Sequence, residues 1–151
     1  MKLGVFGSRT ICDVRAALII AETIQQLNNV THIVTTQEPR GVCEVAQRFA
    51  KEQHLILELH FLNFAHAGGM FEHRSDQVIK SSDYILLIHD GVSHGTANEL
   101  ERTKKFCKPY CYKVIEPTNL SFDRDIGFNI KNDLKQTSSP VTDDFNINDF
   151  I

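Results

Sequence analysis

The chain lacks a long hydrophobic run and an excess of basic residues. Its 151 residues include 19 acidic side chains and 16 lysines and arginines, which gives a net charge of −3. This balance argues against a DNA-wrapping protein, because phosphate contacts need clustered lysine and arginine. No segment approaches the roughly 18 apolar residues of a membrane helix, and the apolar run within residues 2–7 is too short for a signal peptide. These absences predict a cytoplasmic protein.

Cysteine is scarce and metal-ligand spacing is missing. The four cysteines, at positions 12, 43, 107 and 111, do not form the framework of a small secreted protein. They form no Cys-x-x-Cys pair and have no convincing histidine partners, so they are expected to be buried free thiols rather than metal ligands. The seven histidines are scattered, and surface roles are expected for His73 and His94. Neither a metal nor an organic cofactor is expected.

Apolar runs alternate with segments of helical periodicity along the first three quarters of the chain. The strands are rich in continuous apolar residues, which is typical of a parallel sheet covered on both faces. We therefore expect an α/β fold: a Rossmann-like three-layer domain over residues 1–116 with a mostly parallel five-stranded sheet. The expected strands are 2–7, 32–36, 55–61, 83–89 and 110–115, and the expected helices are 13–28, 42–50, 70–81 and 94–106.

Residues 117–151 form a polar C-terminal extension rich in Asn, Asp, Ser and Thr, which we expect to be partly disordered. One helix at 122–135 and a linker at 136–144 are compatible with its composition. Residues 143–151 alternate acidic and apolar side chains, as in a docking peptide for a partner protein. A frayed tail, or one folded back on its own domain, explains the same pattern.

Ligands of open parallel sheets bind beyond the carboxyl ends of the strands, so the loops at that edge are the candidate site. Gly7-Ser8-Arg9 offers backbone and hydroxyl donors and a cation for a phosphate, although an ordinary turn explains it too. Arg40-Gly41 begins the second helix in a similar way, but Gln37-Glu38-Pro39 before it is bulky and acidic, which favours a structural role for that loop. His66 to Gly69 fits a flexible connection equally well.

Residues 89–99, His-Asp-Gly-Val-Ser-His-Gly-Thr-Ala-Asn-Glu, carry the strongest functional pattern. An apolar strand ends in a loop containing Gly91 and Ser93, and Gly95-Thr96 begin a helix whose free N–H groups favour an anion. Glu99 is expected in the first turn, and Arg74 in the helix before the strand is expected to face the same cleft. A glutamate there suits ribose hydroxyls, an oxocarbenium ion or a water. A surface arginine and a helix-dipole glutamate are the plainer alternative.

These residues resemble the SLOG superfamily, which includes YspA-like proteins, the DprA/Smf Rossmann-like domain and the LOG phosphoribohydrolases. The resemblance covers residues 2 to about 115, and its order of motifs is closest to the YspA-like proteins. It rests on Gly7-Ser8-Arg9 with Asp13, Arg40-Gly41-Val42, Arg74, Ser82-Asp83-Tyr84, and Gly91-x-x-x-Gly95-Thr96-x-x-Glu99. Asp90-Gly91-Val92 replace the Pro-Gly-Gly of LOG enzymes, which is expected to place an acid near the phosphate.

The resemblance implies a Rossmann-like fold that binds a nucleotide or nucleotide-derived ligand. It further implies LOG-like hydrolysis of the N-glycosidic bond of a nucleoside 5′-monophosphate, with Arg74 and Glu99 as catalytic residues and Gly95-Thr96 at the phosphate. A homodimer is expected because LOG-like relatives are commonly dimers. The alternatives are a non-catalytic ligand sensor or adaptor whose tail docks a partner, single-stranded DNA binding as in DprA, which the charge disfavours, and nucleoside deoxyribosyl transfer.

Overall fold

A computed structural model of the chain describes residues 1–66 and 68–118. The expectations for a helix at 122–135, a linker at 136–144 and a docking tail at 143–151 lie outside these residues. The described elements alternate between strand and helix as predicted, with boundaries that differ by at most two residues. They are β1 (Lys2–Gly7), α1 (Val14–Gln26), β2 (His32–Thr36), α2 (Val42–Glu52), β3 (Ile56–His60), α3 (Met70–Ser81), β4 (Tyr84–His89), α4 (His94–Lys105) and β5 (Tyr110–Val114).

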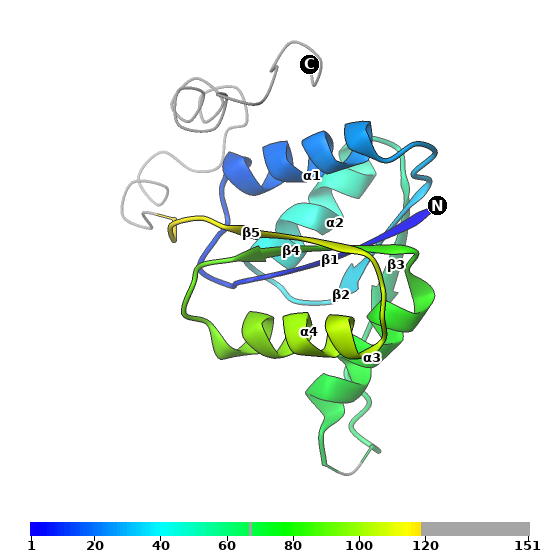
Figure 1. The fold of residues 1–151 in the computed structure, drawn as a ribbon, viewed down its shortest axis with the longest axis vertical. Helices are drawn as coiled ribbons and strands as arrows, with labels where there is room; N and C mark the ends of the chain where they lie inside the picture. Colours follow the sequence, from blue (N-terminus) through cyan, green and yellow to red (C-terminus); the bar gives the residue numbers. More distant parts are fainter. Residues whose placement is uncertain (67, 119–151) are drawn as a thin grey trace.

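The five described strands form one parallel sheet in the order β3-β2-β1-β4-β5. Helices α1 and α2 cover one face, and α3 and α4 cover the other, so the predicted three-layer α/β fold is confirmed (Figure 1). The chain moves from β1 outward to β3 and then returns to place β4 on the other side of β1. This reversal of strand order is where doubly wound sheets bind ligands, because the neighbouring loops diverge there.

Alternating side chains of the central strands supply both halves of the core, because successive residues of a strand face opposite sides of a sheet. Leu86 and Ile88 pack towards α1 and α2, whereas Ile85 and Leu87 pack towards α3 and α4. All four are fully buried. The continuous apolar run of β4 is therefore the signature of a strand covered on both faces.

The start of α1 is held by Asp13, as the sequence predicts. Its carboxylate accepts a hydrogen bond from the backbone N–H of Arg15 at 3.0 Å. The same carboxylate accepts one from the hydroxyl of Thr118, and the backbone N–H of Thr118 donates to the carbonyl of Thr10. The packed part of the chain thus continues at least two residues past the predicted domain boundary at residue 116.

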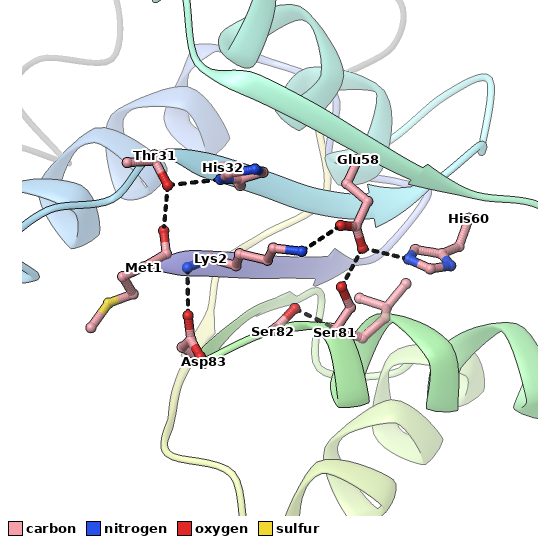
Figure 2. Close-up of polar contacts among 10 residues, drawn as sticks. Met1, Lys2, Thr31, His32, Glu58, His60, Ser81, Ser82 and Asp83 are labelled. Carbon is pink, nitrogen blue, oxygen red and sulfur yellow. Dashed lines mark hydrogen bonds and ion pairs between the residues drawn. The ribbon is translucent and has the colours of Figure 1, made fainter.

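A charged cluster joins β1, β3 and the end of α3 (Figure 2). Lys2 on β1 contacts the Glu58 carboxylate on β3 at 2.8 Å, and His60 lies 2.7 Å from its other oxygen, which also accepts a hydrogen bond from Ser81. Burial alone would raise the pKa of Glu58, but these hydrogen bonds outweigh it and lower the pKa to about 2.

We expect Glu58→Gln to lower the free energy of unfolding at pH 7 by about 1–2 kcal/mol. Since the folded-state pKa lies below the unfolded value, the wild-type stabilisation is complete above about pH 4.5 and is lost towards pH 2. Urea unfolding at pH 7 and pH 3 should therefore show a smaller difference between the two proteins at pH 3. Glu52→Gln, at an exposed position of α2, is the control. A difference that grows on acidification would contradict the prediction.

Candidate functional site

A cleft of about 330 Å³ lies at the carboxyl ends of β1, β2 and β4, next to the reversal of strand order. Four segments contribute to it: the end of β1, the connection from β2 with the start of α2, the first half of α3, and the loop before α4 with the first half of α4. Its lining residues are Gly7, Ser8, Arg9, Glu38, Arg40, Cys43, Phe71, Arg74, Ser93, Gly95, Thr96 and Glu99.

The N-terminus of α4 offers donors to this cleft. Ser93 occupies the N-cap position, but within the described residues no side chain caps the helix. The Ser93 hydroxyl instead donates to Asp90 at 2.6 Å. Thr96 is buried in the first turn, and its hydroxyl lies 3.3 Å from that of Ser8. Uncapped N–H groups and the positive end of the helix dipole make this helix start suitable for an anion.

Asp90 shapes the loop before α4 and does not line the cleft. Its carboxylate accepts hydrogen bonds from the backbone N–H groups of Val92 and Ser93 and from the hydroxyl of Thr10, at 2.7–2.9 Å. Burial would raise the pKa of Asp90, but these bonds keep it below its usual range, so the group is a carboxylate. Asp90 thus lies outside the lining of the cleft, because hydrogen bonds within the turn draw its side chain inward, and its expected place near a phosphate stays a prediction.

Arg74 on α3 is buried and forms an ion pair with Glu38, with 2.6 Å between guanidinium Nη2 and carboxylate Oε1. Arg9 contacts the same oxygen at 3.0 Å. Burial would raise the pKa of Glu38, but the two arginines lower it. Glu38 therefore belongs to the cleft, although the sequence favoured a purely structural role for its loop. The Nε of Arg74 is buried and has no hydrogen-bond partner within the described residues.

Glu99 lies in the second turn of α4, not in the first as expected, because the helix begins at His94. Three residues after Thr96 it faces the sheet, close to Cys43 and Arg74. Burial raises the pKa of Glu99 to about 8, and the Glu38 carboxylate adds to this effect, whereas Arg74 and a hydrogen bond with Ser75 lower it. At neutral pH Glu99 is therefore largely a carboxylic acid.

Most of the predicted site residues line the cleft, but two glycines do not. Gly41 packs against the backbone of Ser8 and Arg9 behind the lining. Gly91, with a φ of 89°, turns the loop next to Val114. Arg74 and Glu99 line the same cleft, as expected, although the described hydrogen bond of Arg74 goes to Glu38 rather than to Glu99.

Three residues that line the cleft were not predicted as site residues from the sequence: Glu38, Cys43 and Phe71. Glu38 follows the end of β2, so its place at the carboxyl edge of the sheet was the available signal. Phe71 gives no signal of its own, since a phenylalanine in an amphipathic helix usually belongs to the core. The thiol of Cys43 is buried as expected, and burial, together with the nearby Glu99, raises its pKa.

The other cysteines differ from the expectation that all four are buried free thiols. None of the four, all within the described residues, is in a disulfide bond. Only Cys43 is fully buried, however, and Cys107 is exposed in the turn after α4, so the expectation that all are buried is wrong. Among residues 1–66 and 68–118, no three His, Cys, Asp or Glu side chains come together in a way that would hold a metal ion.

Comparisons with known proteins found no relative of this chain. No protein-family model, curated protein or solved structure matches the chain. In the described part of the chain, every helix is too short or too polar to cross a membrane. The function is therefore inferred from the cleft.

Proposed function

We propose that this chain binds a nucleotide or nucleotide-derived ligand in the cleft and hydrolyses the N-glycosidic bond of a nucleoside 5′-monophosphate. One observation carries the proposal: a single cleft combines an uncapped helix N-terminus, a buried arginine with an unpartnered Nε, and a glutamate whose pKa is raised to about 8. Perturbed carboxyls in a cleft are typical of catalytic sites.

The phosphate belongs at the start of α4, beside Gly95 and Thr96. Two features support this placement. Backbone N–H groups at a helix start bind anions without a charged side chain. The lining also carries three arginines, Arg9, Arg40 and Arg74, against the Glu38 carboxylate, which leaves a positive balance while Glu99 is protonated.

Glu99 is the proposed catalytic acid. The bond between the anomeric carbon and the base nitrogen breaks with its electron pair going to the base, and the proton of Glu99 neutralises the departing base. Water then adds to the ribosyl cation, and its proton returns to the Glu99 carboxylate. A bound phosphate would raise the pKa of Glu99 further through repulsion, which keeps the acid form available.

The test is chromatography of nucleoside 5′-monophosphates, nucleosides and NAD after incubation with the protein. We expect free base from a monophosphate, a loss of at least ~100-fold in Glu99→Gln, and a rate that declines above about pH 8. Glu101→Gln, an exposed neighbour on α4, is the matched control and should keep full activity.

The outcomes separate the alternatives. Ligand binding without base release from any compound would favour the non-catalytic sensor or adaptor. Base release from nucleosides that lack the phosphate, with transfer to a second base, would favour deoxyribosyl transfer. Failure of every compound to bind would contradict the proposal.

A further inference from the structure

A second hollow, of about 310 Å³, adjoins the cleft. The two share Arg9, Glu38, Phe71 and Arg74, so they form one continuous depression. Beyond the four shared residues, the second hollow is lined mainly by apolar side chains, two of them phenylalanines, and we call it the aromatic hollow. Its remaining lining residues are Gln37, Pro39, Phe61, Leu62 and Phe64.

Three phenylalanines of this hollow are exposed to solvent. Phe64 is 81% exposed, Phe61 54% and Phe71 48%. They come from the connection between β3 and α3 and from the first turn of α3. Single exposed apolar residues are common, but three aromatic rings gathered on one concave surface mark a place where an apolar group binds.

The junction between the two hollows carries polar groups. The Arg74 guanidinium lies 5.5 Å from the centre of the Phe71 ring, and its Nε is buried without a partner among the described residues. Glu38 accepts hydrogen bonds from Arg74 and Arg9 at the same place. A ligand that extends from the aromatic hollow to the N-terminus of α4 therefore lies against the Arg74 guanidinium, a donor, and the Glu38 carboxylate, an acceptor.

We infer that the aromatic hollow is a stacking site for the base of the ligand whose phosphate lies at α4; this rests on the proposed function. A planar ring stacks on exposed phenylalanines, and every base offers such a face. The ribose then lies at the junction, beside the Arg74 guanidinium and the Glu38 carboxylate.

The experiment compares three probes by calorimetry in the Glu99→Gln protein, which leaves the monophosphate intact: adenosine 5′-monophosphate, adenosine, and ribose 5-phosphate, which lacks the base. We expect Phe64→Ala to weaken adenosine 5′-monophosphate and adenosine about tenfold and to leave ribose 5-phosphate unchanged. Because Phe64 is 81% exposed, its replacement by alanine should not disturb folding, and a loss of affinity would reflect a lost contact with the base. Val92→Ala is the control, since Val92 is 77% exposed but lines neither hollow.

The two proposals fail in different ways. If ribose 5-phosphate binds and Phe64→Ala leaves the affinity for adenosine 5′-monophosphate unchanged, the stacking site is overturned and the phosphate site stands. If adenosine binds in a Phe64-dependent manner and ribose 5-phosphate does not bind, the stacking site stands and the phosphate site fails. A Phe64→Ala protein that changes only its oligomeric state would assign the hollow to a second copy of the chain and overturn the inference.

Discussion

The Glu99→Gln protein should be more stable than the wild type at alkaline pH and equally stable near pH 4. The physical reason is the burial of an ionisable group, which raises the pKa of Glu99 to about 8. Above that pH the folded protein must hold a carboxylate where solvation is poor, whereas the unfolded chain solvates it freely. Glutamine fills the same volume and carries no charge.

The direction follows from proton binding. Between about pH 4.5 and pH 8 the folded state keeps the Glu99 proton that the unfolded state has released, so wild-type stability falls as the pH rises through this window. The accumulated effect is on the order of 4 kcal/mol by pH 9. Glutamine removes this dependence, and the difference between the two proteins isolates it from the titration of histidines.

Urea unfolding at intervals from pH 4 to pH 9 measures this difference. The stability advantage of Glu99→Gln should grow from near zero to its full value and level off above pH 8. Glu101→Gln, whose side chain is 73% exposed on the same helix, should show a small and flat difference. A Glu99→Gln advantage that shrinks with rising pH would show that the wild-type carboxyl is stabilised in its charged form.

Gly41→Ala should lose about 3 kcal/mol of folding free energy and also weaken ligand binding. Gly41 has a φ of 80° and a ψ of −159°, a conformation essentially restricted to glycine. A Cβ there would lie 2.5 Å from the Cα of Arg9 and 2.8 Å from the carbonyl oxygen of Ser8. Both contacts are with backbone, so relief requires the loop after β1, which lines the cleft, to move.

Gly95→Ala is the matched control for stability. A Cβ on Gly95 meets no atom within 4 Å, and the residue lies in the first turn of α4 without a positive φ. Alanine there should leave the free energy of unfolding unchanged or raise it by up to about 1 kcal/mol. The midpoint of urea unfolding should therefore stay the same or increase. Equal midpoints of urea unfolding for the wild type and Gly41→Ala would contradict the prediction, because the loop after β1 would then move without a loss of folding free energy.

Much of the fold could be predicted because its signals are local. The apolar run Ile85 to Ile88 and the spacing of apolar residues in α1 each indicate one kind of element without reference to the rest of the chain. Asp13 likewise caps α1 within two residues of its own position. The alternation of strand and helix then leaves few arrangements of a parallel sheet.

The candidate site could be predicted only as a set of loops. Gly7 to Arg9 and Gly95-Thr96 lie in the cleft because the carboxyl ends of parallel strands share one edge. The partner of Arg74 could not be predicted, since Glu38 is 36 residues away and its loop resembles an ordinary connection. The turn of α4 that holds Glu99 depends on where the helix begins, and Ser93 is its N-cap in a turn closed by a local hydrogen bond from the Ser93 backbone N–H to Asp90.

The α/β class, the order of the elements and the edge of the sheet that holds the candidate site follow from the sequence, because periodicity and turn residues act over a few positions. The charge states and the shape of the candidate site depend on how distant segments pack against one another. Burial raises the pKa of Glu99, two arginines lower the pKa of Glu38, and the packing of α3 beside the β3 connection gathers three phenylalanines into one hollow. These properties depend on solvation and on contacts between distant segments, which no local pattern contains.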